Sequence, residues 1–492
     1  MKVLMVMQHI NFFRNLDTLV RELDARGHQV VMLHGTRLDD DKMRAKLARK
    51  RETMIFMGRG IEVAQADLPS VTAGYRPEPA ERWHRRLRSG REVINRTIYM
   101  RRGHPSPERV TEGLDKRLPP RVRRLMESWL GGRVLRQPFV LRLWRCIEAV
   151  SPPSRTVVSL LEEIRPDVVL VSPTVWPKNP VEADYIRAAR TLGIPTIGYL
   201  NSWDNLTSKG TVHVIPDAYV VWNEALASEA VEIHDIPRGA IRITGAPHLD
   251  RFFEMQPTVP RAEMCREMGC DGDAPYVVYL CSSRTLISSE VHIVTDLADA
   301  LAGAFPASGP PTLVVRPHPV NPDPWESYSH PGVVVYPKVG DQADSPESWQ
   351  EYYNQLSWAS CFVGLNTTAF LEAAIVDRPC LTIVADEFHA VQGWTGHFRH
   401  LLEADFLEVA RDAREVAERV VRILAGEDAK AAEREAFRKW FLRPSGVDKP
   451  VTLGVADLME TVAGIPLSTA DPVVEEAASG RDLALAAKDA TR

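Results

Sequence analysis

Cysteine is scarce in this sequence, and its spacing does not suit a disulfide framework or a zinc site. The 492 residues contain six cysteines and no Cys-x-x-Cys pair. Disulfide scaffolds and structural zinc sites both need paired or clustered thiols. We therefore expect free thiols in a reducing compartment.

Long hydrophobic runs and a strong net charge are also missing. The opening segment MKVLMVMQHINFFRN turns polar too early for a signal peptide, and no later run reaches about 18 apolar residues. The 60 basic and 65 acidic residues give a formal charge of −5, which argues against a surface built as a whole for nucleic acid. With 45% hydrophobic and 25% charged residues, the chain has an ordinary globular composition and room for two or three domains. We expect a cytoplasmic protein.

Short apolar runs alternate with helical patterns along most of the chain. Such alternation predicts parallel sheets whose strands are joined by crossover helices, and hence an α/β protein with two Rossmann-like domains. In the first half, strands are predicted at 2–7, 30–33, 167–172, 195–200 and 218–222, and helices at 16–23, 154–164 and 180–192. In the second half, strands are predicted at 276–281, 312–317, 333–337, 360–365 and 380–385, and helices at 290–304, 347–358, 368–376 and 412–424.

These two blocks set the predicted domain limits. The amino-terminal domain covers 1–254 and the carboxy-terminal domain covers 275–427, with a turn-rich linker at 255–274. Residues 428–465 are predicted to form helices that pack back toward the amino-terminal domain. The segment 466–492 is rich in Ala, Asp and Glu, and we predict a disordered tail there.

A basic insert interrupts the amino-terminal domain at 81–145. It contains seventeen Arg and one Lys against six acidic residues, so its local charge is about +12. Large apolar residues such as Trp83, Trp129 and Trp144 are interleaved with the arginines, as in basic amphipathic helices. Three interpretations stay open: a solvated helical insert whose arginines pair with acids elsewhere, a surface that binds an anionic membrane, or, least favoured, a nucleic-acid contact.

Polar residues follow the predicted strands of the second domain, where doubly wound sheets bind ligands. Residues 366–368 precede a helix, where hydroxyls and free amides can bind phosphate, although a simple N-cap explains the threonines equally well. Arg316 or His318 would supply further donors, unless the RPHP segment is only a stiff turn. Glu372 would accept hydrogen bonds from ribose hydroxyls, with a surface glutamate as the alternative. The candidates for this site are Ser282, Ser283, Arg284, Arg316, His318, Asn366, Thr367, Thr368 and Glu372.

A second group of polar residues follows the last predicted strand. Glu387 and Gln392 belong to a dense tract of polar and titratable groups over 386–397. Such density at a strand end indicates a substrate site without identifying the substrate.

These features together resemble a known family. The two Rossmann-like domains, the serine pair at 282–283, the RPHP segment at 316–319 and GLNTTAFLEAAIVDRP at 364–379 are similar to the nucleotide-sugar glycosyltransferases of the GT-B fold. The similarity is to the branch near bacterial surface-polysaccharide transferases and CDP-glycerol glycerophosphotransferases, and it covers about 1–32 and 155–460. It implies two domains facing a cleft, a nucleoside diphosphate sugar as donor substrate and no permanently bound cofactor.

The resemblance also implies roles for residues of the amino-terminal domain. His9 stands after the first strand, where inverting members carry a general base, although no GGxG or GxGG loop follows that strand here. The loop NSWDNLTSKG at 201–210 resembles a segment of the polysaccharide-related branch. Its Trp203, Asn205 and Lys209 would bind a sugar and Asp204 is the second candidate base, whereas an Asx-turn loop packed on Trp203 is the structural alternative.

No DxD pair directly follows a predicted strand, so we expect catalysis without a metal. The leading hypothesis is a glycosyltransferase that moves a sugar to a soluble or lipid-linked hydroxyl acceptor in surface polysaccharide or glycolipid synthesis, cytoplasmic or peripheral on the inner membrane face. The alternatives are a CDP-glycerol-type glycerophosphotransferase and a catalytically inactive GT-B-shaped binding protein. Nucleic acid is not expected as a partner.

Overall fold

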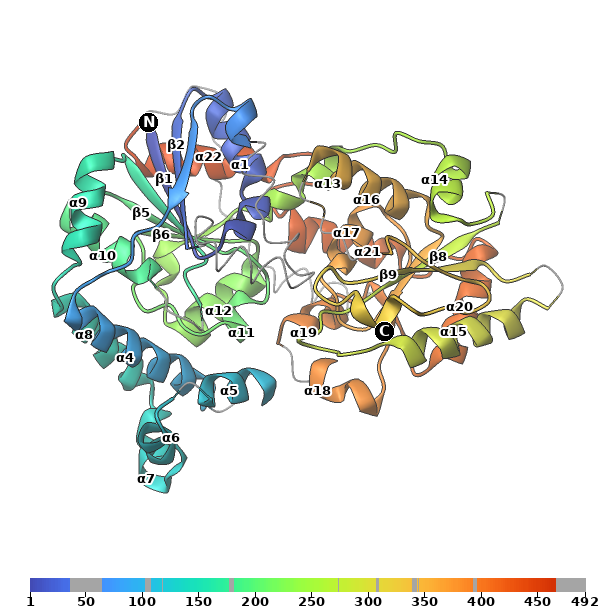
Figure 1. Cartoon of the computed structure of the whole chain (residues 1–492), viewed down its shortest axis with the longest axis horizontal. Helices are drawn as coiled ribbons and strands as arrows, with labels where there is room; N and C mark the ends of the chain where they lie inside the picture. Colours follow the sequence, from blue (N-terminus) through green and yellow to red (C-terminus); the bar gives the residue numbers. More distant parts are fainter. Residues whose placement is uncertain are drawn as a thin grey trace, which may run out of the picture.

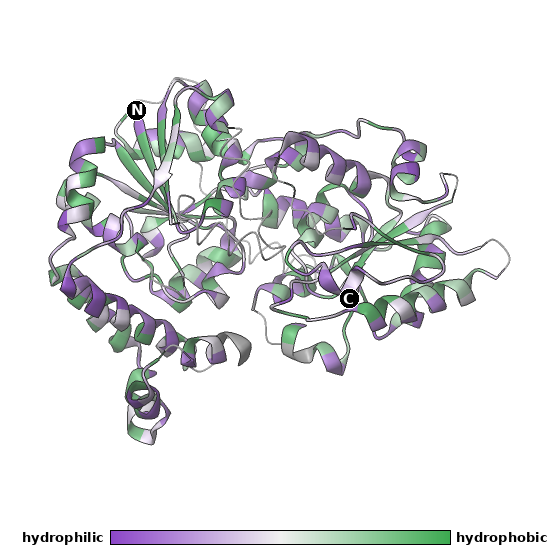
Figure 2. Cartoon of the chain, viewed as in Figure 1, coloured by the Kyte–Doolittle hydropathy of each residue, from purple (hydrophilic) through white to green (hydrophobic). Residues whose placement is uncertain are grey.

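Two parallel β-sheets, each covered by helices, lie side by side in the molecule (Figure 1). Hydrophobic residues concentrate on the strands and on the helix faces that cover them (Figure 2). The computed structural model describes residues 1–35, 64–101, 108–116, 118–176, 181–272, 274–306, 309–338, 343, 345–392 and 396–465. The aspartates at 39–41 and 273 and the predicted tail at 466–492 lie outside the described residues.

The first sheet has seven strands in the order β3-β2-β1-β4-β5-β6-β7, and every neighbouring pair is parallel. The predicted strands of this half are confirmed, and two short ones, β3 and β7, were not predicted. The strands are β1 (Lys2–Met7), β2 (Gln29–His34), β3 (Val71–Tyr75), β4 (Val168–Ser172), β5 (Thr196–Tyr199), β6 (Ala218–Val221) and β7 (Ile241–Ile243).

The helices of this half follow the predicted apolar spacing, with one addition at the first strand end. The segment after β1, expected to be a loop, forms a short 3-10 helix, η1 (Ile10–Asn15), and His9 caps it by accepting from the Asn11 amide. The other helices are α1 (Asp17–Ala25), α9 (Arg155–Ile164), α10 (Glu182–Thr191), α11 (Asn205–Ser208) and α12 (Glu224–His234), with short turns η3 (Arg238–Ala240) and η4 (Pro247–Leu249).

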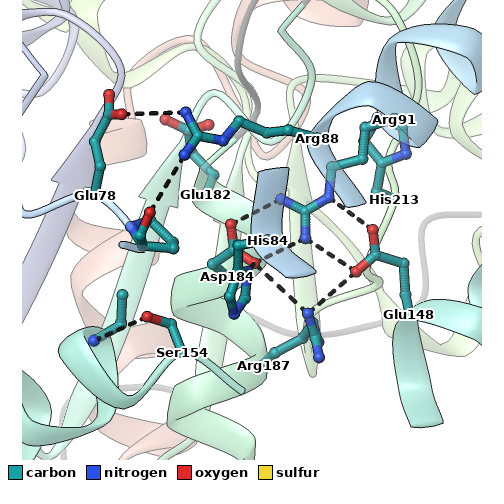
Figure 3. A network of polar contacts seen from close by, with 12 residues as sticks. Glu78, His84, Arg88, Arg91, Glu148, Ser154, Glu182, Asp184, Arg187 and His213 are labelled. Carbon is teal, nitrogen blue, oxygen red and sulfur yellow. Dashed lines mark hydrogen bonds and ion pairs between the residues drawn. The ribbon is translucent and has the colours of Figure 1, made fainter. Parts of the chain in front are cut away.

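The basic insert is helical, and two of its helices are anchored by buried charge. Its helices are α4 (Arg82–Ile98), α5 (Glu108–Asp115), α6 (Pro120–Glu127), α7 (Trp129–Leu135) and α8 (Pro138–Val150). Arg91 of α4 donates to Glu148 of α8 at 2.6 and 2.9 Å and to Asp184 of α10 at 2.8 Å (Figure 3). All three side chains are at most 2% exposed, and Arg187 lies beside them. The insert is therefore fixed to the first sheet through α10.

The second sheet has six parallel strands in the order β10-β9-β8-β11-β12-β13. They are β8 (Tyr276–Leu280), β9 (Thr312–Arg316), β10 (Val333–Val335), β11 (Cys361–Gly364), β12 (Cys380–Ile383) and β13 (Leu407–Ala410), of which only β13 was not predicted. The helices are α15 (Val291–Ala304), α16 (Pro346–Trp358), α17 (Ala369–Ile375), α18 (His389–Gln392), α19 (Gly396–Glu403) and α20 (Ala413–Leu424), with turns η5 (Asp323–Trp325) and η6 (Asp386–Phe388).

Two stretches of chain join the sheets. The first contains α13 (Asp250–Glu254) and α14 (Arg261–Met268), and the second contains α21 (Ala431–Phe437), the π-helical turn η7 (Arg438–Leu442) and α22 (Val451–Val462). Helix α22 packs against α1 of the first sheet. Hydrogen bonds join these two connecting segments: buried Asp250 of the first accepts from Arg443 at 2.6 Å and from the Thr452 hydroxyl at 2.7 Å, both in the second.

Candidate functional site

Helix α16 lies beside the second sheet in a group of cationic and aromatic side chains, called the cationic surface below. It consists of Arg14, Arg251, Arg316, Trp349 and Tyr352. The guanidinium of Arg316, at the end of β9, lies over the ring of Tyr352 at 4.1 Å from its centroid. Its Nη1 donates to Oε1 of buried Gln355 at 2.5 Å. Two residues of one helix therefore fix the orientation of this cation.

The first domain contributes a second cation to the same surface. Arg14 lies in η1, after β1, and its guanidinium carbon is 5.2 Å from the ring centroid of Trp349 in α16. Arg251 of α13 lies over the same ring at 4.5 Å. The charge of Arg14 acts on both Glu372 and His318, so it reaches the predicted nucleotide site from the opposite domain.

Glu372, in α17, is a buried carboxylate in this cationic surface. Only 7% of the residue is exposed, and its Oε2 has no hydrogen-bond partner among the described residues. Burial raises the pKa of Glu372 to about 7, against the opposing effects of a backbone hydrogen bond and of the charges of Arg14 and Arg316. Burying an oxygen atom without a hydrogen-bond partner costs free energy. This carboxylate is therefore suited to accept hydrogen bonds from hydroxyl groups of a ligand.

The two predicted histidines, His318 and His9, are both neutral, and His318 also lies within reach of the charge of Arg14. Burial, together with Arg14, lowers the pKa of His318 to about 4, and its Nδ1 accepts from the Val320 amide at 3.2 Å. Burial, together with neighbouring His34, lowers the pKa of His9 to about 4. Both imidazoles are therefore neutral at physiological pH, and either can accept a proton.

In the loop after β8, Ser282 is buried, whereas Ser283 and Arg284 are more accessible. Ser282 is fully buried: its amide and hydroxyl donate to Glu290 at 2.7 and 3.1 Å, and its hydroxyl accepts from the Asn366 amide. Asn366 donates to the Val391 carbonyl. These hydrogen bonds tie the loops after β8 and β11 together, and the assignment of Ser282 and Asn366 to the nucleotide site stays a prediction.

Trp203 connects the two domains instead of offering a free aromatic face. Its indole nitrogen donates to the hydroxyl of Thr368 at 3.2 Å, and its ring packs edge-on against His397 and Phe441. Only 1% of Trp203 is exposed, so no ring face is available to a sugar in this conformation. The structural alternative of a loop packed on Trp203 describes the arrangement. The hydroxyl of Thr367 accepts from the Ala369 amide, whereas Thr368, the N-cap residue of α17, makes no side-chain capping hydrogen bond.

Asp204 is held as an ion pair, which weakens it as a candidate base. Its Oδ2 lies 3.1 Å from Nζ of Lys209, and the Ser208 hydroxyl also donates to it at 3.1 Å. Burial opposes its ionisation and is the largest single effect, but Lys209, His397 and Ser202 together outweigh it and hold the pKa of Asp204 below its usual range. The side-chain oxygen of Asn205 accepts from the Ser202 amide in the same loop, and its assignment as a sugar ligand stays a prediction.

Residues at the carboxyl end of the insert helix α4 make hydrogen bonds to the end of this loop. The Tyr99 hydroxyl accepts from the Gly210 amide at 2.8 Å, and Asn95 accepts from the Thr211 amide at 2.9 Å. The conformation of the loop at 201–210 therefore depends on the insert, which the sequence patterns did not indicate.

The two candidates after β12 are not brought to the cationic surface by any contact that the structure shows. Exposed Glu387 lies 3.5 Å from His292 of α15. Buried Gln392 donates to the carbonyls of Leu365 and Ile383 at 3.0 and 2.8 Å. Its amide group thus ties the end of β11 to the end of β12, whereas its Oε1 has no hydrogen-bond partner among the described residues; the prediction that Gln392 binds substrate is left as it was.

The sequence analysis missed four residues that shape the surface: Arg14, Trp349, Tyr352 and Gln355. The three from α16 recur every three residues along one helix face, a pattern equally typical of core packing. Arg14 could have been predicted, because it lies in the segment after β1 and ligands bind beyond the carboxyl ends of parallel strands.

No group of three or more His, Cys, Asp or Glu side chains that could hold a metal ion is found in the described part of the chain. None of the helices described is long and apolar enough to cross a membrane.

Known structures share this two-sheet architecture. The chain resembles a putative UDP-N-acetylglucosamine 2-epimerase of Listeria monocytogenes, with a TM-score of 0.53 and 11% identity, over 94% of this chain and 96% of that one. It resembles MnaA of S. aureus, solved with UDP, with a TM-score of 0.51 and 10% identity, over 96% and 98%. A glycosyltransferase of Rickettsia africae matches with a TM-score of 0.48 and 9% identity, over 94% and 98%.

No family model matches the sequence, and no curated protein matches it. At these identities the two matches with TM-scores above 0.5 define the fold alone. The chain has the GT-B fold.

Proposed function

We propose that this protein binds a nucleoside diphosphate sugar between its two domains and transfers the sugar to a hydroxyl acceptor. The observation that carries the proposal is the buried carboxylate of Glu372, whose Oε2 lacks a partner, in a surface that also holds Arg14 and Arg316. A ligand that satisfies this arrangement needs neighbouring hydroxyls for the carboxylate and an anion for the guanidiniums. A ribose linked to a diphosphate has both.

In this proposal the cations act in the transfer step as well as in binding. The acceptor oxygen attacks the anomeric carbon, and the bond from that carbon to the diphosphate oxygen breaks. Negative charge then grows on the departing diphosphate, where Arg14 and Arg316 stabilise it. Arg316 is already oriented by Tyr352 and Gln355, so little reorganisation is needed.

We assign the general base to His9 rather than to Asp204. His9 lies at the start of η1, the element that also carries Arg14, and its neutral imidazole can take the acceptor proton. The negative charge of a bound diphosphate would raise its pKa and increase its basicity. Asp204 is a weaker base because Lys209 stabilises its ionised form.

Incubation with a radiolabelled UDP-sugar, with and without a hydroxyl acceptor mixture, tests the reaction. Transfer of label to the acceptor, with release of UDP, supports the proposal. Conversion of the sugar to an epimer without an acceptor would instead assign the site to epimerisation. A parallel incubation uses radiolabelled CDP-glycerol as the donor. Transfer of label from CDP-glycerol but not from the UDP-sugar would assign the site to glycerophosphate transfer. Nucleotide binding without any turnover would indicate an inactive binding protein.

A further inference from the structure

Large hydrophobic side chains are exposed mainly in one part of the molecule, the arm formed by residues 120–150. Of the twelve that are exposed in the described part of the chain, eight lie in α6, α7 and α8. Trp129 is 78% exposed and Val150 is 83% exposed. Helices α6 and α7 project away from the body beyond α4, and green, hydrophobic segments are visible along them (Figures 1 and 2).

Helix α8 shows that this exposure follows a pattern. Phe139, Leu143, Ile147 and Val150 recur every three or four residues, so they share one face, and all four are exposed. Leu141 and Glu148, on the other face, are buried against the body. One face of α8 therefore packs on the protein, whereas the other presents an apolar stripe to the surroundings.

A concentration of exposed apolar groups of this kind is unusual for a folded surface. Single exposed hydrophobic residues are common, but clusters mark sites that another surface covers. The arm is not a loosely attached segment that exposes its core by fraying, because Arg91 fixes α4 to Glu148 of α8 through buried hydrogen bonds. Arg145 of α8 further donates to the Val212 carbonyl at 2.9 Å.

The charges around these apolar groups identify what covers them. Within the arm six arginines are exposed, whereas Glu127 is its one exposed acid. The exposed arginines are Arg121, Arg123, Arg124, Arg133, Arg136 and Arg142. Arginine stays protonated at every physiological pH, so the arm carries a permanent positive field. Large apolar residues, tryptophan and arginine together suit the boundary between lipid headgroups and acyl chains.

We propose that the arm at 120–150 docks the protein on an anionic lipid bilayer, with Trp129 and Leu130 entering the headgroup boundary and the arginines contacting lipid phosphates. The apolar stripe has no use in a contact with nucleic-acid phosphates, and the six arginines would repel the same arm of a second copy. This proposal does not depend on the reaction assigned above.

Co-sedimentation of the full chain with lipid vesicles tests the proposal. We expect binding to vesicles of phosphatidylcholine and phosphatidylglycerol at low salt, and none to vesicles of phosphatidylcholine alone. Several hundred millimolar salt should release most of the protein, because screening weakens the arginine contacts. A fraction should stay bound at high salt, since burial of apolar side chains is insensitive to screening.

Apolar insertion is tested by the double variant Trp129→Ser/Leu130→Ser. Both side chains are exposed, so their replacement leaves the fold intact, and partitioning onto anionic vesicles should fall by at least about tenfold. The matched control is Val409→Ser/Leu453→Ser, which changes two exposed hydrophobic residues outside the arm and should bind like the wild type.

The electrostatic part is tested by Arg121→Ser/Arg124→Ser. Two basic residues at an anionic surface account for about a 30-fold change in partitioning, which is the expected loss. The control Arg411→Ser/Arg414→Ser removes two exposed arginines of the second domain and should leave binding unchanged.

A label on Cys146 gives a readout that does not require a variant. This thiol is exposed in α8, next to Ile147 of the apolar stripe, whereas four of the other five cysteines are buried. Burial raises the pKa of the fifth, Cys270, to about 12, so its thiol reacts slowly. An environment-sensitive fluorophore at Cys146 should shift its emission to the blue with anionic vesicles.

Four results would overturn the proposal. These are no binding to anionic vesicles at low salt, binding that the arm variants do not weaken, dimerisation in solution that only the arm variants abolish, and binding to duplex DNA or RNA without binding to vesicles.

Discussion

The pH dependence of nucleotide-sugar affinity follows directly from the state of Glu372. In the free protein its pKa is about 7, raised mainly by burial. A carboxylate that accepts two ribose hydroxyls must be ionised, so the ligand selects the deprotonated form. Because the pKa of Glu372 is raised in the free protein, the carboxyl is mostly protonated below pH 7 and must lose its proton before the ligand binds. Above pH 7 it is mostly ionised, so the affinity should rise with pH and then level off.

The size of the effect can be worked from that pKa. About 9% of Glu372 is ionised at pH 6 and about 91% at pH 8, so the affinity should rise about tenfold across this interval. A UDP-sugar is the right probe, because its diphosphate diester has no ionisation in this range, unlike UDP. In the free protein His9 and His318 have pKa values of about 4 and are already neutral at pH 6, so neither can release a proton when the ligand binds.

Isothermal titration calorimetry in buffers of different ionisation enthalpy measures both the affinity and the proton release. We expect about 0.9 proton to be released per ligand at pH 6 and about 0.1 at pH 8. In Glu372→Gln both the slope and the release should vanish. Burial also raises the pKa of Glu290 to about 7, so Glu290→Gln, which should keep the slope, shows which carboxyl is responsible. An affinity that falls with pH, or a slope that survives in Glu372→Gln, would refute the reasoning.

Three further perturbations have defined outcomes. Trp203→Ala removes a buried ring at the domain contact and should lower the free energy of unfolding by about 3–5 kcal/mol in chemical denaturation; an unchanged free energy of unfolding would contradict the role given to this ring. Arg91→Ala removes the main partner of buried Glu148 and Asp184, which keep only Arg187 and His84 among the described residues, and should cost about 3–5 kcal/mol in the same assay, whereas Arg88→Ala, which removes a partly exposed pair, should cost less than about 1 kcal/mol; equal costs would contradict the role given to burial. His9→Ala should reduce turnover by about 10²- to 10⁴-fold without changing donor affinity, and unchanged turnover would move the general base to Asp204.

The sheets could be predicted from the sequence because their strands are buried on both faces. Runs such as those at 2–7 and 276–280 are continuously apolar and bounded by polar segments, so periodicity locates them without tertiary information. Strands β3 and β7 were missed because neither is a continuous apolar run: β3 contains Thr72 and Gly74, and β7 has Arg242 at its centre. Their pairing depends on neighbouring strands rather than on their own composition.

The candidate site was predictable only where one strand end supplies its residues. Arg316 and Glu372 follow strands of the second sheet, and both lie in the cationic surface. The roles of Ser282 and Trp203 depend on partners far along the chain, Glu290 in one case and Thr368 in the other, and no local pattern reports such partners. Arg14 joins the surface because the two domains meet, which is also invisible in either half alone.

Titration of the wild type and of Glu372→Gln with UDP, CDP, GDP and TDP tests the central claim most directly. The account predicts that at least one diphosphate binds the wild type, and that Glu372→Gln weakens this binding about 10- to 100-fold, because hydrogen bonds to a charged carboxylate are lost. Glu408→Gln, which changes another buried glutamate of the same domain with a raised pKa, should bind like the wild type. Binding of none of the four diphosphates, or equal binding by both proteins, would contradict the claim that this surface is a nucleotide site.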